Sequence, residues 1–222
     1  MQDGARRAGR KVLCAIAFAT AASGAFAEPI KLAALGDSLT QGYGLVQEEG
    51  FVPQLQAWLQ ARGHDVTILN AGVSGDTTAG GLSRVDWTLT PDIDGMIVAL
   101  GGNDLLRGLP PEMSRTNIDG ILKRAAEKQV ETMLVGVEAP GNFGTAYKKS
   151  FDAIYPELAA QYGVVYMADF LAGLTTLPDR AATMRQYMQA DGIHPNAAGV
   201  ALIVEAMGPT VEELLGDVKD GS

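Results

Sequence analysis

The sequence predicts a three-layer α/β/α domain in which a five-stranded parallel sheet is covered by helices on both faces. Two observations support this prediction. Short apolar runs rich in β-branched residues alternate with longer segments in which apolar residues recur at helical spacing. The chain also lacks the break in composition that would mark a second domain. Right-handed crossovers leave few strand arrangements, and we choose the order 2-1-3-4-5, which the sequence itself does not determine.

The predicted elements follow one another along the whole chain. Strands are expected over residues 30–35, 66–69, 96–100, 132–137 and 164–167. Helices are expected over residues 51–59, 77–87, 111–128, 147–162 and from residue 200 onward. The glycine-containing segment 40–44 is expected to form a loop or an irregular helix. Proline disrupts helix interiors, so Pro156 is expected to kink the fourth helix or mark its restart, and Pro209 to interrupt the last helix.

The first 27 residues have the pattern of a cleavable secretory signal peptide. A basic region is followed by the apolar run Val12 to Ala22 and by the small-residue cleavage pattern Ala25-Phe26-Ala27. The apolar run is shorter than the roughly 20 residues that a membrane-spanning helix needs. We therefore expect cleavage after Ala27, one mature domain over residues 28–222, and a periplasmic or secreted location.

The charge and cysteine content restrict the partners of the mature chain. The full chain has a net charge of −9, and the leader carries four basic residues and one acidic residue, so the mature chain is more acidic still. Such a surface disfavours nucleic acids and anionic membranes, which both need basic patches. The single cysteine, Cys14, lies in the leader, which leaves the mature chain without disulfides or a thiolate metal site. We expect a monomer with no stable membrane insertion.

Four motifs follow predicted strands and are therefore expected at one edge of the sheet. Ser38 follows the first strand, Gly75 the second and Asn103 the third, while Asp191 and His194 lie beyond the fifth. Ligands of open parallel sheets bind outside the carboxyl ends of the strands, where the strand order reverses. The sequence therefore predicts a functional site at this edge, between the first and third strands.

The chemistry of these residues suggests a nucleophile with its base. A serine hydroxyl such as that of Ser38 needs a base within hydrogen-bond reach. The mature chain has two histidines, and His64 precedes the second strand, which places it at the opposite edge of the sheet. His194 is therefore the predicted base. Asp191, three residues earlier, can accept a hydrogen bond from the other ring nitrogen and stabilise the imidazolium.

A serine nucleophile also needs donors for the oxyanion of its tetrahedral intermediate. The candidates are the backbone N–H groups of Ser38 and Gly75 and the side-chain amide of Asn103. Taken singly, each residue could have a structural role instead: Ser38 could cap a helix, and Gly75 and Asn103 could each serve a turn. Asp191 could likewise organise only its own loop. The functional interpretation depends on all of them occurring together.

The motifs resemble, in order, the sequence blocks of the GDSL or SGNH hydrolases. They are Gly36-Asp37-Ser38-Leu39, Ser74-Gly75-Asp76-Thr77, Gly101-Gly102-Asn103-Asp104 and Asp191-Gly192-Ile193-His194-Pro195. The resemblance covers nearly the whole mature chain and is strongest to the bacterial periplasmic thioesterase, lysophospholipase and arylesterase group. It implies a flavodoxin-like fold and a Ser-His-Asp hydrolase of acyl esters, including aryl esters and lysophospholipids, and of acyl thioesters, without metal or cofactor. It also implies that Ser38 is the nucleophile, Gly75 and Asn103 are oxyanion donors, and Asp191 and His194 are orienter and base.

Several apolar residues are candidates for binding the acyl chain. Leu105, Leu106 and Leu109 follow Asn103 in a segment expected to be a loop, where solvated residues are usual. They could belong to the core, or they could form an acyl-chain wall that moves on binding, with Gly108 providing flexibility. Phe143, after the fourth strand, could line the same groove.

Other functions are compatible with parts of the pattern. Clustered carboxylates at strand ends could hold Mg²⁺ in a phosphatase, the candidates being Asp37, Asp76, Asp104 and Asp191. A flavodoxin-like nucleotide or flavin binder is a second alternative, although the first loop lacks the ending of a phosphate-binding P-loop. A carbohydrate O-deacetylase of the same family is the nearest competitor. The preferred interpretation is an exported serine esterase and thioesterase.

Overall fold

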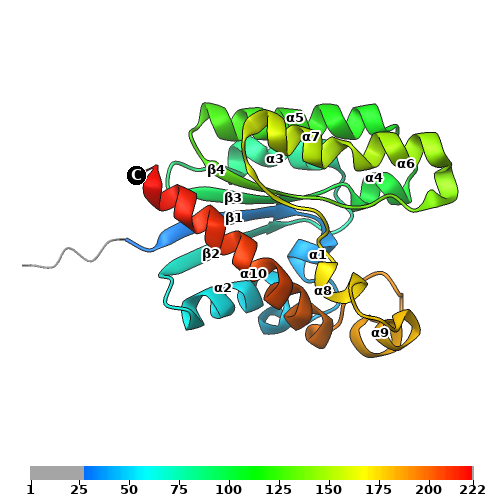
Figure 1. Cartoon of the computed structure of the whole chain (residues 1–222). Helices are drawn as coiled ribbons and strands as arrows, with labels where there is room; N and C mark the ends of the chain where they lie inside the picture. The colour runs from blue at the N-terminus through cyan, green and yellow to red at the C-terminus, as the bar shows by residue number, and fades with distance from the viewer. Residues whose placement is uncertain (1–27, 222) are drawn as a thin grey trace, which may run out of the picture.

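A computed structural model describes residues 28–221, so the predicted leader, residues 1–27, lies outside the described residues (Figure 1). The chain forms one five-stranded sheet with the order β2-β1-β3-β4-β5, and all four strand pairs are parallel. The predicted order is therefore confirmed. The strands are β1 (Ile30–Gly36), β2 (Val66–Gly72), β3 (Gly95–Ala99), β4 (Glu131–Val135) and β5 (Val165–Met167).

Helices cover both faces of this sheet. The α-helices are α1 (Ser38–Gln41), α2 (Phe51–Ala61), α3 (Thr78–Thr88), α4 (Gly102–Leu106), α5 (Pro111–Glu127), α6 (Thr145–Asp152), α7 (Ile154–Tyr162), α8 (Ala172–Thr175), α9 (Arg180–Tyr187) and α10 (Ala197–Asp220). Two short 3₁₀ helices cover Gln47–Glu49 and Gly141–Phe143. In Figure 1, α3, α5 and α7 lie on one face of the sheet, and α2 and α10 lie on the other.

The alternation of side chains along β1 explains why both faces are covered. Leu32 and Ala34 point into the core beneath α2 and α10, whereas Ala33 and Leu35 point into the core beneath α3, α5 and α7. All four residues are almost completely buried. A strand that is apolar on both faces needs a layer of helices on each side, which is the usual condition of a parallel sheet.

The register of the central strands brings their carboxyl ends to one edge. Gly36, the last residue of β1, pairs with Gly72 of β2 and with Ala99 of β3. The chain segments that follow these three residues therefore leave the sheet side by side. They carry Ser38 and Asn103, as predicted, together with the turn that contains Gly75.

The two helix prolines have different effects. The predicted restart is confirmed at Pro156, because α6 ends at Asp152 and Pro156 lies in the first turn of α7, where a backbone N–H has no helical partner to lose. The predicted interruption at Pro209 is wrong, because α10 continues through it to Asp220. Buried Met207 and Val211 flank this proline. Each buried apolar side chain stabilises the packed helix by about 1.5–3 kcal/mol, which offsets a proline cost of about 3 kcal/mol.

Between residues 28 and 221, the structure contains no helix of the length and apolar character needed to span a bilayer.

Candidate active site

The path of the chain after β1 places Ser38 at the edge of the sheet. Asp37 caps the short helix α1, its carboxylate accepting a hydrogen bond from the backbone N–H of Leu39 at 3.0 Å. Ser38 is the first residue of that helix. A side chain at position 36 would collide with Thr40 and with the carbonyl oxygen of Ala99. Glycine at this position therefore lets α1 fold back across the strand ends, and Ser38 faces the cleft beyond them.

The structure brings the predicted nucleophile, base and orienter together. Ser38 Oγ lies 2.8 Å from Nε2 of His194, and Nδ1 of the same imidazole lies 2.7 Å from Asp191 Oδ2. The second carboxylate oxygen of Asp191 accepts hydrogen bonds from the backbone N–H groups of Ile193 and His194. The aspartate thus organises its own turn and orients the imidazole at the same time.

These hydrogen bonds also determine the charge of Asp191. The hydrogen bond to His194, followed by the two backbone N–H donors, lowers the pKa of this carboxyl from 3.8 to about 2. An ionised Asp191 carboxylate accepts a hydrogen bond from the imidazole Nδ1–H and so fixes the orientation of the ring. The other ring nitrogen, Nε2, can then accept a proton from the serine hydroxyl.

The stabilisation that Asp191 provides is expected to depend on pH. Its pKa is about 2 in the folded chain against the usual 3.8, so at low pH the unfolded chain binds the proton more tightly. The contribution is therefore complete above the unfolded pKa and is lost as the pH falls through the folded pKa. The urea midpoints of wild type and of Asp191→Asn would be measured at a series of pH values. The difference between the two midpoints should be constant above about pH 5 and should shrink as the pH falls toward about pH 2. A difference that stays constant down to the lowest pH would contradict this expectation.

Two residues that the sequence did not single out hold the histidine loop. The Tyr43 ring lies against the His194 imidazole, with 4.6 Å between the ring centroids. Nε2 of Gln189 donates to the carbonyl oxygens of Tyr43 and Pro195, at 2.8 and 2.9 Å. This amide links the loop after α1 to the loop of His194, and so it sets the position of the base relative to Ser38.

Asn103 is oriented by a buried carboxylate. Its Nδ2 donates to Asp37 Oδ2 at 3.2 Å, and Asp37 is only 5% exposed. Burial raises the pKa of Asp37, while the hydrogen bonds from Leu39 and Asn103 act in the opposite direction. The contact uses one of the two N–H donors of the Asn103 amide. It also fixes the plane of the amide and thus the direction of the second N–H.

Gly75 lies in a tight turn that only glycine adopts readily. Its φ is +80°, and the turn is closed by a hydrogen bond of 3.0 Å from the N–H of Asp76 to the carbonyl of Val73. The Gly75 carbonyl accepts a hydrogen bond from Arg107 at 2.7 Å. This hydrogen bond fixes the carbonyl group of Gly75. The turn forms part of the cleft wall beside Ser38.

A cleft of about 560 Å³ extends from Ser38 and His194 and has largely apolar walls. Leu105, Leu106 and Phe143 are among its lining residues, and Leu106 and Phe143 are 66% and 42% exposed. Leu109 is not among the described residues that line the cleft, and its carbonyl instead accepts a hydrogen bond from Tyr147.

The segment after Asn103 is not the loop that the sequence predicted. Residues 102–106 form the short helix α4, with Leu105 buried in the core and Leu106 facing solvent. The neighbouring Asp104 anchors this helix, because its buried carboxylate accepts hydrogen bonds from the N–H and hydroxyl of Thr78 and from the hydroxyl of Ser114. Buried donors that are paired in this way hold the helix in one position.

The four strand-end carboxylates considered as metal ligands have separate partners. Asp37 is bound by Asn103, Asp76 by Arg84, Asp104 by Thr78 and Ser114, and Asp191 by His194. Among residues 28–221, no group of three histidine, cysteine, aspartate or glutamate side chains is arranged to hold a metal ion. Asp37, Asp76 and Asp104 organise the loops around the cleft through these hydrogen bonds.

The fold and the contacts define a class of protein. A serine hydroxyl, an imidazole and a carboxylate lie in series at the carboxyl edge of a flavodoxin-like sheet, next to an asparagine amide and a glycine turn. This is the arrangement of the SGNH class of hydrolases. Residues 34–202 match the sequence model of the GDSL-like lipase/acylhydrolase family, and the chain belongs to that family.

Relatives and solved structures agree with this assignment. Esterase TesA of Pseudomonas aeruginosa is 35% identical over 185 residues, which cover 83% of this chain and 89% of the relative. Thioesterase 1/protease 1/lysophospholipase L1 of Escherichia coli is 32% identical over 182 residues, covering 82% of this chain and 83% of the relative. The crystal structure of AlinE4, an SGNH-hydrolase family esterase, is 41% identical and has a TM-score of 0.68, covering 85% of this chain and 98% of that chain.

Proposed function

We propose that the protein is a serine esterase and thioesterase that hydrolyses small acyl esters and thioesters through an acyl-enzyme. The observation that carries the proposal is the continuous hydrogen-bonded series from Ser38 through His194 to Asp191, with distances of 2.8 and 2.7 Å. A hydroxyl in contact with a neutral imidazole can lose its proton as it attacks a carbonyl carbon.

The reaction has two similar halves. The Ser38 oxygen bonds to the acyl carbon while His194 takes the hydroxyl proton, and the carbonyl oxygen becomes an oxyanion. His194 then gives that proton to the leaving alcohol or thiol as the bond to the acyl carbon breaks. Water attacks the resulting acyl-serine as the same imidazole takes its proton, and the imidazole returns that proton to the Ser38 oxygen as the acid is released. Asp191 remains ionised throughout and stabilises the imidazolium.

The oxyanion is held by three donors from three segments of the chain: the backbone N–H groups of Ser38 and Gly75 and the amide of Asn103. Donors that are already oriented before the reaction stabilise developing negative charge without reorganising. The hydrogen bond from Asn103 to Asp37 and the closed turn around Gly75 support this role, because each restricts the motion of a donor.

The cleft beside Ser38 fits the acyl chain of the substrate. Its walls near Ser38 include Leu105, Leu106 and Phe143, whose apolar surfaces an acyl chain would cover. The names of the relatives, an esterase and a thioesterase/lysophospholipase, support the same class of bond. Leu109 has no part in this proposal.

The cleft residues should determine preference for chain length. Phe143→Ala removes an apolar side chain from the wall, so we expect the KM of an octanoyl ester to rise about fivefold while that of an acetyl ester changes little. Steady-state kinetics on a series of p-nitrophenyl esters would measure this. Met113→Ala, which removes a side chain of similar exposure outside the cleft, is the control. Equal changes for both esters would contradict the role of Phe143.

The proposed chemistry can be tested by covalent labelling. The mature protein is treated with a fluorophosphonate, and its intact mass is compared with that of Ser38→Ala treated in the same way. One adduct on the wild type and none on the variant would support an activated serine at position 38. A folded wild type that gains no adduct would contradict the proposal and favour the binding-protein alternative.

The proposal includes export. The leader pattern ending at Ala27 supports cleavage there, a mature domain over residues 28–222, and a periplasmic or secreted location. The mature protein is proposed to act as a monomer. Amino-terminal sequencing and light scattering of the protein recovered from the expressing cells would test the two statements separately.

A further inference from the structure

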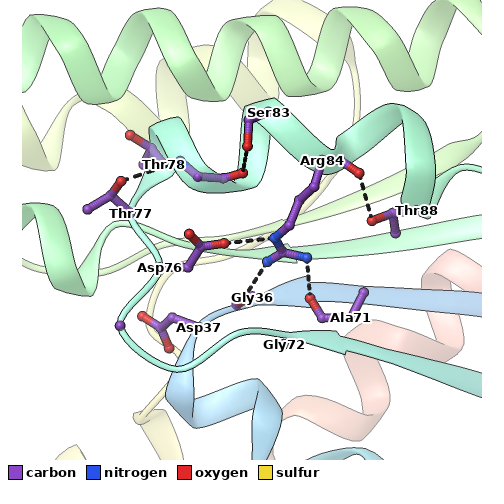
Figure 2. Close-up of polar contacts among 12 residues, drawn as sticks. Gly36, Asp37, Ala71, Gly72, Asp76, Thr77, Thr78, Ser83, Arg84 and Thr88 are labelled. Atoms are coloured by element: carbon purple, nitrogen blue, oxygen red, sulfur yellow. Dashed lines mark hydrogen bonds and ion pairs between the residues drawn. The ribbon is translucent and has the colours of Figure 1, made fainter.

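Arg84 connects the chain segments that carry two of the three proposed oxyanion donors. It lies on α3, and its guanidinium makes three hydrogen bonds, to Asp76 Oδ2 at 2.7 Å and to the carbonyl oxygens of Ala71 and Gly36 at 2.6 and 2.9 Å. Figure 2 shows the guanidinium between α3 and the ends of β1 and β2, with hydrogen bonds to Gly36, Ala71 and Asp76. Its side chain is 22% exposed, so these contacts are largely shielded from water.

The three acceptors lie close to the donors in the sequence. Gly36 is two residues before Ser38, and Asp76 directly follows Gly75. The Gly36 carbonyl also accepts a hydrogen bond of 3.0 Å from the N–H of Val73, the residue that begins the Gly75 turn. The Arg84 side chain and this backbone contact therefore both join the Ser38 segment to the Gly75 segment beyond the end of the strand ladder.

The geometry requires arginine rather than a positive charge alone. Three different nitrogens, Nε, Nη1 and Nη2, each donate to a different acceptor. A planar guanidinium holds its donors at fixed angles, whereas a lysine ammonium is a single flexible point of charge. Lysine at position 84 could keep the ion pair with Asp76 and still lose the fixed spacing of the two strand ends.

We propose that Arg84 is a positioning residue for hydrolysis, which keeps the backbone N–H groups of Ser38 and Gly75 at the separation that the oxyanion needs. This inference rests on the proposed function. Loss of the guanidinium lets the two segments move apart, and a displacement of about 1 Å in a catalytic group can reduce the rate about 10²-fold. Substrate binding in the apolar cleft does not depend on this spacing.

The test compares Arg84→Met and Arg84→Lys with the wild type. The control is Arg115→Met, because Arg115 also donates to a carboxylate at 2.7 Å, that of Glu157, in a surface contact between α5 and α7. Unfolding curves first establish that each variant is folded at the assay temperature. The measured quantities are kcat and KM for p-nitrophenyl butyrate, and the inhibition constants of butylboronic acid and of butyrate.

The boronic acid separates positioning from general destabilisation. Bound to the serine oxygen, its boron becomes tetrahedral and places one of its own oxygens where the oxyanion forms, whereas butyrate reports the binding of the acyl product. For both Arg84 variants we expect kcat to fall about 10- to 100-fold with KM within about twofold. The boronic acid should bind more weakly by a similar factor, while butyrate binding and the Arg115 control stay within about twofold of wild type.

Three results would overturn the inference: a folded Arg84→Met with wild-type kcat, full activity in Arg84→Lys, or equal weakening of boronic acid and butyrate. Ser38→Ala, measured in the same series, separates this failure from failure of the proposed function. If Ser38→Ala keeps wild-type turnover, the proposed function fails and the inference fails with it. If Ser38→Ala is inactive and folded Arg84→Met is fully active, the inference alone fails.

Discussion

His194→Ala is expected to lower kcat for ester hydrolysis by about 10⁴-fold or more, because no other base contacts Ser38 Oγ within residues 28–221. Without the imidazole, the serine hydroxyl is not deprotonated as it attacks, and the leaving group receives no proton. Ser38→Ala should lose a similar amount, and the double variant should lose no more than either single one, since the two residues act as a unit. Steady-state kinetics with a p-nitrophenyl ester would measure all three.

The second histidine provides a matched control. His64 lies at the opposite edge of the sheet, where its Nε2 is 2.8 Å from Glu212 Oε1. His64→Ala removes the same side chain and should leave kcat within about twofold of wild type, with a small loss of stability because a partly buried hydrogen bond is removed. A His194→Ala enzyme that kept a tenth or more of its turnover would show that this imidazole is not the base.

Asn103→Ala is expected to lower kcat by about 10²–10³-fold with little change in KM, because an oxyanion donor acts on the charge that develops only in the transition state. The variant should stay folded, since Asn103 is partly exposed and α4 keeps its anchor through Asp104. Kinetics of the variant, checked by its unfolding curve, would measure the effect.

The contact between Asn103 and Asp37 allows a sharper version of this experiment. If Asp37 acts by orienting the amide, then Asp37→Asn should lower kcat by itself and add little once Asn103 is already alanine. Independent, additive losses would mean that Asp37 acts by another route, such as its cap on α1. An Asn103→Ala enzyme within about threefold of wild type would remove Asn103 from the oxyanion hole.

Much of the fold could be read from the sequence because the relevant information is local. Apolar runs such as 30–35 and 96–100 predict buried strands. The carboxyl ends of parallel strands necessarily lie at the same edge of their sheet. Together with the strand order 2-1-3-4-5, that rule predicts Ser38, Asn103 and the His194 loop at one site. His64 was placed away from the site by the same reasoning, and its position next to Glu212 agrees.

Local rules failed where burial or helix formation competed with them. Pro209 was expected to break the last helix, but the apolar packing on both sides of it keeps α10 continuous. Leu105 and Leu106 were expected in a loop after Asn103, yet they belong to the short helix α4, which the buried carboxylate of Asp104 anchors. Leu109 looked equivalent to Leu105 and Leu106, but only the latter two line the cleft.

The sequence by itself determined the layers of the fold, the edge of the sheet where the site lies, and the main candidate residues at that edge. Only the tertiary structure decided which side chains hold those residues in place. Arg84 reaches acceptors 8, 13 and 48 residues away, and Gln189 reaches Tyr43 across 146 residues. Such contacts depend on how a helix or loop is rotated against the sheet. That rotation results from the packing of both cores at once, which no short stretch of sequence encodes.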